Sequence, residues 1–493
     1  MKEVRSFFGS GVVSAVAAFI ARHYVVLAAA ILALALFNLG FRLGSEIVTE
    51  WDESLYALSA AEMLHSGKWV ATTSFGALDY YNAKPPLNVW LIVLAFKAFG
   101  GSLVSLRLVS VISAWSTIAV LMFWTRRIIG PIVSLFAGFI LATTFGFIYV
   151  HSARSGNPDA LFTLLILLVA VTLAASRARP WMRVWLGPLF AAAFMLKGMG
   201  VLMPAAIVLV VELLRRKGSR PPLRPWLVAA ALFAIPVGAW AVARWQVDGT
   251  AFFKVLFGYD FIARTVGVIE EHPGSWLYYL DVLQRNHYDW LIAGIAAIVL
   301  VPGPRRWIVE QLRLWRRDDR VLICGTWMGL TLLIPTVMQT KLPWYLNEFY
   351  PVFAIATACL IVRGLARVPM PSAPQGRQIA LAAVVVMAAA VAEGKLIWYS
   401  FEHRDLAHSM QGLILGERDQ LIGQRVFRQH WDRAETFVLS ELVGAEQHEA
   451  PTLDVFMTES CAGDYLLTSA ALDLPELELI REGDTERLYR RRE

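Results

Sequence analysis

The sequence predicts an all-α polytopic membrane protein with a small soluble α/β domain at its C-terminus. Of its 493 residues, 57% are hydrophobic and 17% are charged, whereas about a quarter of the residues of a soluble domain are charged. Apolar runs of the length that crosses a bilayer recur from residue 24 to residue 399. After Ser400 these runs shorten, acidic residues become frequent, and strand-like segments such as 452–457 and 464–467 alternate with helical ones.

We expect about 11 to 13 transmembrane helices, all within residues 1–399. Eleven apolar runs fit spans at 24–44, 104–124, 131–150, 158–176, 183–197, 199–214, 226–245, 288–302, 320–338, 345–363 and 377–398. The run 87–99 is only about 13 residues long and contains Lys97, so it fits an interfacial or re-entrant helix better than a full crossing. Residues 44–103 would then form an outer loop with interfacial helices, and residues 400–493 would form the soluble domain.

The arginines indicate how the chain is oriented. With eleven spans, the arginine-rich loops near residues 126, 179, 216, 305–320 and 367 all lie on the side of the N-terminus. Because cytoplasmic loops are enriched in Lys and Arg, that side is expected to be the cytoplasm. The net charge of +6 therefore reflects membrane orientation and not nucleic-acid binding. Cys324 and Cys359 fall inside apolar runs while Cys461 lies alone in the tail, so an internal disulfide is not expected. None of the three has a His or Cys neighbour at metal-ligand spacing, so a zinc site built on them is not expected either.

The loop of residues 51–86 carries the most polar signals on the outer side. Asp52 and Glu53 directly follow the first span, although acids at such a position are often only markers of the membrane boundary. Lys84 precedes two prolines, which restrict it to an extended backbone. Its ammonium is therefore stiffly presented, which suits the binding of a phosphate. The alternative is a lysine that snorkels from the short helix that follows.

Other outer loops carry further candidates. Arg154 and Asp159 lie at the opening of the fourth span, where Asp159 could serve only to complement the helix dipole. Lys197 precedes a glycine at an outer turn, which could also be a plain hairpin connection. His272 is followed by aromatic residues, and a lone histidine in a loop is usually exposed to solvent. A lysine near a proline and aromatic residues recurs at the last outer turn, with Lys341 and Tyr345.

In this order the motifs resemble those of a known family. An Asp-Glu pair after the first span, a Tyr-Tyr-x-x-Lys-Pro-Pro-Leu segment, an Arg and a Pro-Asp, a Leu-Lys-Gly turn, a distal His and a Lys-Leu-Pro-x-Tyr turn follow one another. This order is similar to that of the bacterial branch of the protein-mannosyltransferase-like (GT-C) glycosyltransferases, which includes the aminoarabinose and galacturonosyl transferases that modify lipid A. The resemblance covers residues 24–399.

The resemblance implies a GT-C transmembrane glycosyltransferase domain in residues 1–399. It also implies a polyprenyl-phosphate sugar donor and an acceptor in lipid A, lipopolysaccharide or another envelope glycan. The protein would be a monomer in the bacterial inner membrane. Its N-terminus would be cytoplasmic, and its active site and C-terminal domain would be periplasmic.

The resemblance also implies roles for individual residues. Asp52 would be the principal catalytic carboxylate and Asp159 a second one, with Glu53 as a further candidate beside Asp52. Lys84 would bind the donor phosphate. The remaining residues expected to contact the donor or another substrate are Arg154, Lys197, Lys341, Tyr80, Tyr81, Tyr345 and His272.

One position departs from the family pattern. In the aminoarabinose transferases a glutamate directly before the lysine holds a divalent metal together with the distal histidine. The corresponding positions here are Ala83 and His272. A two-ligand metal site is therefore incomplete, and His272 is left either as a lone metal ligand or as a contact of the substrate. The same substitution weakens an assignment of the sugar as aminoarabinose.

Two alternatives to a lipid A transferase are a protein O-mannosyltransferase, which would differ only in its acceptor, and a transporter or flippase of lipid-linked sugars. Transporters place charges near the middle of the membrane and often show internal symmetry. In this sequence the charged candidates gather on one face and the two halves do not match, which favours an enzyme.

Overall fold

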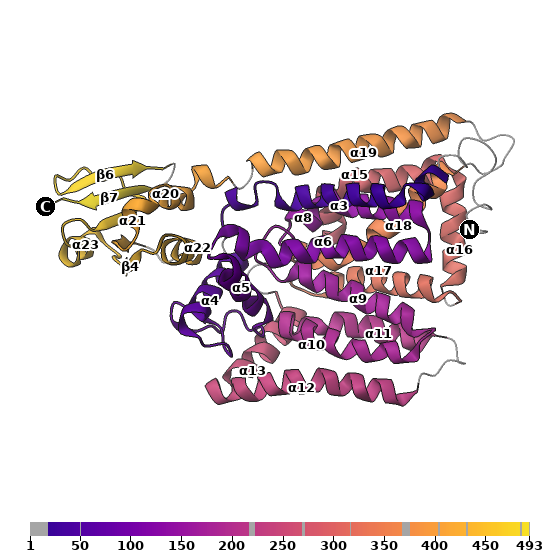
Figure 1. Cartoon of the computed structure of the whole chain (residues 1–493), viewed down its shortest axis with the longest axis horizontal. Coiled ribbons are helices and arrows are strands. Elements are labelled where there is room, and N and C mark those ends of the chain that lie inside the picture. The colour runs from indigo at the N-terminus through magenta and orange to yellow at the C-terminus, as the bar shows by residue number, and fades with distance from the viewer. Residues whose placement is uncertain are drawn as a thin grey trace.

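The computed structural model describes residues 18–492 except 50, 216–221, 269–271, 316, 367–374, 403–404, 430–431 and 484–485. Most of these residues form a body of helices that run in roughly the same direction (Figure 1). The helices of this body are α3 (Tyr24–Gly40), α6 (Leu103–Ile128), α7 (Pro131–Ala142), α8 (Phe145–Tyr149), α9 (Asp159–Ser176), α10 (Leu186–Lys197), α11 (Leu202–Leu214), α12 (Leu223–Asp248), α15 (Tyr278–Leu300), α17 (Asp319–Val337), α18 (Tyr350–Leu365) and α19 (Gln375–Glu402). One more helix, α16 (Pro302–Leu314), is bent by 97° from α15 and crosses the end of the body.

The number of helices that could cross a membrane is lower than expected. Within the described ranges, eight helices are long and apolar enough, or nine if the bent pair of α15 and α16 is one span. One of the eight is the continuous stretch Pro180–Leu214. Its Arg183 contacts Ser176 at the end of α9, its Lys197 contacts Asp159 at the start of α9, and Arg215 after it returns to Ser176.

The stretch Pro180–Leu214 therefore runs along α9 and back again, as two short helices, α10 and α11, joined by a turn (η3, Gly198–Val201). A further expected span, 131–150, is divided into the short helices α7 and α8. With these shorter elements, each of the eleven runs predicted from the sequence contains a helix. The difference in number comes from length, because several of these helices are shorter than a full crossing requires.

Arginines gather at one end of the body, which we call the arginine end. Here the Arg126 guanidinium lies 4.0 Å from the ring centroid of Tyr24, and Arg320 donates to the carbonyl of Ile128. Arg215 forms an ion pair with Asp319 at 2.7 Å. The opposite end, which we call the loop end, carries the segment between α3 and α6 and the C-terminal domain (Figure 1).

The segment at the loop end contains a short 3₁₀-helix, two α-helices and a small hairpin: η1 (Leu43–Ser45), α4 (Asp52–Ser66), β1 (Thr73–Ser74), β2 (Ala77–Leu78) and α5 (Leu87–Phe99). The predicted short helix over residues 87–99 is confirmed as α5, with 13 residues. Three further short elements follow α12 at the same end: α13 (Ala251–Val255), the π-helix η4 (Leu256–Ala263) and α14 (Arg264–Val266).

The C-terminal domain is a five-stranded sheet with short helices. Its elements are α20 (Met410–Gly416), α21 (Arg418–Leu421), β3 (Arg425–Arg428), α22 (Arg433–Phe437), the π-helix η7 (Val438–Val443), β4 (Glu446–Glu449), α23 (Leu453–Glu459), β5 (Tyr465–Thr468), β6 (Leu477–Glu482) and β7 (Arg487–Arg491). The strand order is β4-β3-β5-β7-β6, with β3 parallel to β4 and β5, and β7 antiparallel to both neighbours. This confirms the predicted α/β domain.

One of the two strands predicted in this domain is wrong. Residues 464–467 largely coincide with β5, but residues 452–457 lie mostly in helix α23. The Thr452 hydroxyl accepts a hydrogen bond from the backbone N–H of Val455 and so caps the start of this helix. A capping threonine before a short apolar run favours a helix over a strand.

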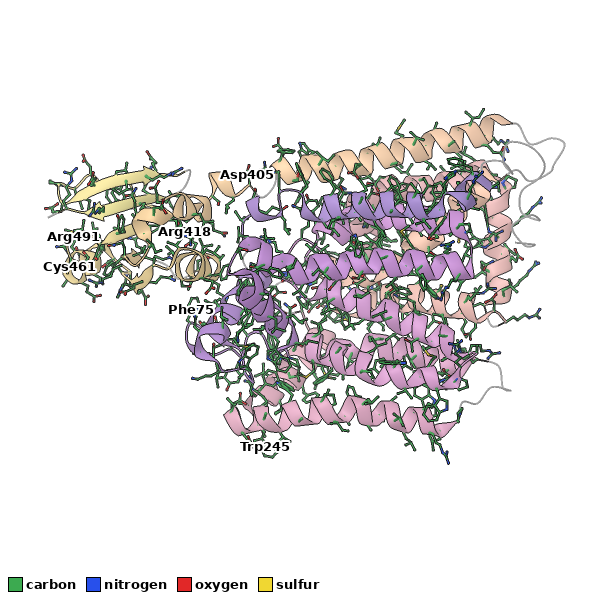
Figure 2. All side chains as sticks on the ribbon, in the orientation of Figure 1. Phe75, Trp245, Asp405, Arg418, Cys461 and Arg491 are labelled. Carbon is green, nitrogen blue, oxygen red and sulfur yellow. The ribbon has the colours of Figure 1, made fainter. Side chains whose placement is uncertain are left out.

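The C-terminal domain and the loop-end helices share one hydrophobic core. Buried residues of α4 and α5, such as Ala57 and Phe96, form a single cluster with Ile414, Phe437 and other residues of the domain. The rings of Phe96 and Phe437 are stacked with centroids 6.0 Å apart. Figure 2 shows Phe75 at the edge of the body that faces this domain. The position of the loop-end helices therefore depends on the domain.

Candidate active site

Three acidic residues, a histidine and a lysine form a continuous chain of contacts at the loop end. His151 Nε2 lies 3.0 Å from Oδ2 of Asp52, and His151 Nδ1 lies 3.1 Å from Oδ2 of Asp159. The other oxygen of Asp159 accepts a hydrogen bond of 2.8 Å from Lys197 Nζ, which lies 3.3 Å from Oε1 of Glu348. Of the three carboxylates, Asp52 is the most accessible, with 27% of its side chain exposed against 1% for Asp159.

Each charged group stands at the end of an element. Asp52 is the first residue of α4 and Asp159 the first residue of α9, where a negative charge complements the helix dipole. Lys197 is the last residue of α10, where a positive charge complements the helix dipole. Glu348 lies in the 3₁₀-helix η5 (Pro343–Phe349). His151 lies in the loop before α9, with a φ of +54° that is uncommon for a residue other than glycine.

The turn after Lys197 requires glycine. Gly198 has a φ of +54°, and a Cβ atom there would lie 3.0 Å from Leu256 Cδ1 and 3.6 Å from Pro85 Cδ. A side chain would therefore be strained and would crowd η4. The close approach places Lys197 beside the backbone that carries Lys84.

Lys84 lies next to Tyr56, one helical turn after Asp52 on α4. The Lys84 Nζ atom is 5.7 Å from the centroid of the Tyr56 ring. Burial raises the pKa of Tyr56 to about 12, the charge of Lys84 opposes this rise, and the charges of Asp52 and Asp159 add to it. Lys84, Tyr56 and the two carboxylates therefore belong to one electrostatic cluster.

His151 is the central residue of the chain of contacts. Burial alone would lower its pKa, but the hydrogen bonds to Asp159 and Asp52 outweigh burial and raise the pKa to about 9. Its ring is stacked on Trp344 at a centroid distance of 4.2 Å and an angle of 10°. Reasoning from the sequence did not assign this residue. The available signal was a histidine that closes an apolar run eight positions before Asp159.

Two predicted site residues, Glu53 and Arg154, are instead buried in the packing around the loop of residues 151–158. The fully buried Glu53 accepts hydrogen bonds from Arg107 Nε at 2.8 Å and from the backbone N–H of Gly156 at 3.0 Å. Arg154 is 1% exposed, pairs with Glu46, and donates to backbone carbonyls at the end of α3 and beyond it. Both side chains fasten the loop of residues 151–158 to neighbouring segments, and neither joins the contact chain of His151.

Lys341 and His272 meet through the backbone. Lys341 Nζ donates to the carbonyls of Pro335, Thr336 and Met338 at the end of α17, and burial lowers the pKa of Lys341. Its backbone N–H donates to the carbonyl of His272 at 3.0 Å, while the His272 residue itself is exposed.

The three predicted tyrosines have different surroundings. Tyr345 lies close enough to Lys197 to influence it electrostatically. Tyr80 packs against the apolar cluster around Ala83. Tyr81 is 38% exposed, and the Arg433 guanidinium of the C-terminal domain lies 5.6 Å from the centroid of its ring.

The residues at the position of the family's metal do not fit a metal site. Ala83 is 2% exposed and packs in an apolar cluster with Met195, Trp240, Phe252 and Leu256. An alanine offers no side-chain donor, and oxygen, nitrogen or thiolate donors are needed to hold a divalent cation. In the described part of the chain, no group of three His, Cys, Asp or Glu side chains is arranged to hold a metal.

The chain is similar in sequence to several known proteins. A family model described as dolichyl-phosphate-mannose-protein mannosyltransferase matches residues 83–241. The undecaprenyl phosphate-α-4-amino-4-deoxy-L-arabinose arabinosyl transferase of Pseudomonas savastanoi pv. phaseolicola is 30% identical over 345 residues, which are 68% of this chain and 61% of that protein. The transferase of the same name from Pseudomonas aeruginosa strain UCBPP-PA14 is 28% identical over 60% of this chain and 52% of that protein. The match thus spans about half to three fifths of these curated relatives.

Solved structures show the same fold. The crystal structure of ArnT from Cupriavidus metallidurans bound to undecaprenyl phosphate superposes with a TM-score of 0.69 and 16% identity, over 94% of this chain and 97% of that one. The apo oligosaccharyltransferase of Archaeoglobus fulgidus gives a TM-score of 0.53 and 11% identity, over 90% of this chain and 69% of that one. The fold is therefore the GT-C fold of membrane glycosyltransferases. In sequence, the chain is similar to members of the protein-mannosyltransferase-like family, among them the arabinosyl transferases of Pseudomonas.

Proposed function

We propose that this protein transfers a sugar from a polyprenyl-phosphate donor to lipid A, lipopolysaccharide or another envelope acceptor at the periplasmic face of the inner membrane. One observation carries the proposal: an accessible carboxylate, Asp52, and a lysine, Lys84, both lie close enough to Tyr56 to influence it electrostatically, at the loop end of a GT-C fold. A glycosyl phosphate needs a cation for its leaving group and a carboxylate for its acceptor, and this arrangement offers both.

The proposed reaction is a single displacement at the anomeric carbon. The acceptor oxygen forms a bond to this carbon while the bond from carbon to the phosphate oxygen breaks, and the bonding electron pair leaves with the polyprenyl phosphate. Lys84 stabilises the added negative charge on that phosphate. If the acceptor is a hydroxyl group, its proton passes to the Asp52 carboxylate. If the acceptor is a phosphate group, no proton is transferred and Asp52 orients the acceptor.

The other predicted residues have supporting roles in this proposal. Asp159 and Lys197 fix His151 and the wall of the site through their hydrogen bonds. Tyr345, beside Lys197, and Tyr80 and Tyr81, before Lys84, are proposed to contact the donor. We propose Glu53, Arg154 and Lys341 as structural residues, because their charges are already bound to protein partners.

The sugar and the acceptor are proposed at the level of class. The similar Pseudomonas proteins are named as arabinosyl transferases that use undecaprenyl phosphate-α-4-amino-4-deoxy-L-arabinose, and this supports a lipid-linked donor here. The family model that matches residues 83–241 is described as a protein mannosyltransferase, so a protein hydroxyl is the second candidate acceptor. Mass analysis of lipid A from a deletion strain separates the two, because an unchanged profile excludes lipid A as the acceptor.

The test of the proposed function compares two variants with matched controls. Asp52→Asn and Lys84→Ala should each reduce sugar transfer in membranes by about a hundredfold or more, because each removes a charge that the transition state uses. Transfer is measured with a polyprenyl-phosphate sugar and isolated lipid A. Asp281→Asn and Lys97→Ala remove the same charges from exposed sites and should retain the wild-type rate. Wild-type turnover in either site variant would contradict the assignment.

A further inference from the structure

The histidine between the two carboxylates has a defined geometry but no role in the proposed reaction. Both of its ring nitrogens lie at hydrogen-bond distance from carboxylate oxygens, 3.0 Å on one side and 3.1 Å on the other. An ionised carboxylate can only accept hydrogen bonds. Two ionised partners therefore require a proton on each nitrogen of the ring, which makes the ring an imidazolium cation.

We propose that His151 is a positioning residue that, as a cation, holds the Asp52 carboxylate ionised and in a fixed orientation towards the acceptor. This inference rests on the proposed function. The orientation of the imidazole ring is fixed from three directions: by Asp52, by Asp159 and by the face of Trp344, which is parallel to the ring within 10°. A ring held in this way transmits its orientation to the more exposed of its two partners, which is Asp52.

The charges around the site favour the protonated ring. Asp52 faces His151 from α4 and Asp159 faces it from α9. Beyond Asp159 lie Lys197 of α10 and Glu348 of η5. Lys84 lies beside Tyr56, on which the charges of Asp52 and Asp159 also act, so Lys84 belongs to the same cluster. These are three carboxylates against two lysines, so a cationic imidazole brings the formal charge of the cluster to zero. This agrees with the rise of the pKa of His151 to about 9, where its hydrogen bonds to both carboxylates outweigh burial.

A cationic His151 predicts how transfer depends on pH. Above the pKa of about 9 the ring loses one N–H and can donate to only one carboxylate, so the rate should fall on the alkaline side. Removal of the cation makes it easier to protonate Asp52. Without His151 the acidic loss of activity should therefore begin at a pH that is higher by about one unit or more, since an opposite charge at this distance typically has that effect.

The experiment measures the pH profiles of kcat and of the donor KM for wild type and His151→Gln. A glutamine can still donate to one carboxylate but carries no charge. We expect kcat at pH 7 to fall by about tenfold or more, the acidic limb to move upwards, and the alkaline limb near pH 9 to disappear, while the donor KM changes little. The matched control is His65→Gln, which makes the same change at an exposed histidine that pairs with Glu441 and should leave the profile unchanged.

A second measurement reads the charge of the ring without any turnover. Nuclear magnetic resonance of protein with labelled histidine rings, with the His151 signals identified by their loss in His151→Gln, should show a midpoint near pH 9, against about 6.5 for an ordinary histidine. A midpoint near 6.5, or a His151→Gln enzyme with the wild-type profile, overturns this inference and leaves the proposed function standing. A midpoint near 9 in a protein without transfer activity removes the proposed function and the positioning role, but retains the charged bridge. If His151→Gln does not accumulate, the wild-type titration, with signals identified by His65→Gln and the other single histidine variants, still decides the charge.

Discussion

Asp52 and Glu53 are adjacent in the sequence but have opposite surroundings. The Asp52 side chain is 27% exposed and reaches the imidazole of His151. Glu53 is fully buried, and its two oxygens are bound to Arg107, Thr49 and Gly156. Successive residues at the start of a helix point about 100° apart. One of the two carboxylates therefore faces the candidate site, and the other faces the buried interior.

A substitution at Glu53 tests this division. Glu53→Gln should lower stability by about 3–5 kcal/mol, because it leaves the buried guanidinium of Arg107 without its counter-charge. The activity per folded molecule should remain close to that of the wild type. The measurements are the melting temperature in detergent and the transfer rate normalised to folded protein.

The control for this substitution is Glu482→Gln. Glu482 pairs with Arg487 but is 55% exposed, and exposed pairs contribute about 0–1 kcal/mol. A Glu53→Gln protein that keeps its melting temperature and loses transfer would instead place Glu53 among the reacting groups.

Whether the role of a single residue could be predicted from the sequence depended on whether its hydrogen-bond partners are side chains or backbone groups. Asp52, Asp159 and Lys197 were predicted as candidates from their places at the ends of apolar runs, and Lys84 from the two prolines after it. The structure brings all four to one end. The cation of Lys341, by contrast, is bound by backbone carbonyls at the end of α17. The sequence does not reveal such acceptors, since any residue type can supply a carbonyl group.

At the scale of elements, the C-terminal domain reaches the segment that carries Lys84. Arg433 is the first residue of α22, and its Nε atom donates a hydrogen bond of 3.3 Å to the hydroxyl of Ser74. Its guanidinium is 5.9 Å from the ring centroid of Phe75 and 5.6 Å from that of Tyr81. The domain thus holds residues 73–82 in place, immediately before Lys84.

Removal of this arginine should weaken the binding of the donor. The two cation–π contacts and the hydrogen bond of Arg433 are together worth about 1–2 kcal/mol. Arg433→Ala should therefore raise the donor KM by about tenfold, while kcat at saturating donor stays near the wild-type value. Steady-state kinetics at several donor concentrations measure both constants.

Arg481→Ala is the control for Arg433→Ala, since it removes a 48% exposed arginine of the same domain that pairs with Glu417. If the two variants have the same KM, the contact of Arg433 with residues 73–82 does not contribute to donor binding.

Elements were predicted well where hydropathy alone determines them. All eleven apolar runs contain helices, and α5 has the expected short length. The breaks within these runs were not predicted. Residues 131–150 are divided between α7 and α8 at Thr143 and Thr144, whose hydroxyls bond to carbonyls of the preceding turn. Such local bonds compete with a regular helix but hardly alter the average hydropathy.

At the scale of the whole molecule, the arginine end and the loop end define its two poles. Arginines such as Arg126, Arg215 and Arg320 mark one pole, and the candidate site and the C-terminal domain mark the other (Figure 1). We propose from the positive-inside rule that the arginine end is cytoplasmic.

The native cysteines allow a direct test of this orientation. Cys461 is exposed in the C-terminal domain, whereas Cys324 is partly buried and Cys359 is buried. A membrane-impermeant maleimide should label Cys461 in cells whose outer membrane alone is permeable. With Cys461→Ser, an added Arg306→Cys on α16 should be labelled only after the inner membrane is disrupted. Labelling in the reverse order would invert the proposed topology.

The core shared by α4, α5 and the C-terminal domain has a consequence for the order in which the protein is made. The helices that carry or flank Asp52 and Lys84 emerge early from the ribosome, but they pack against Ile414, Phe437 and Leu488. These partners lie more than three hundred residues further along the chain. Contacts between such distant segments form late. A growing chain therefore holds an unfinished candidate site until its last segment has been translated, and premature termination near residue 400 would yield spans without the partners of α4 and α5.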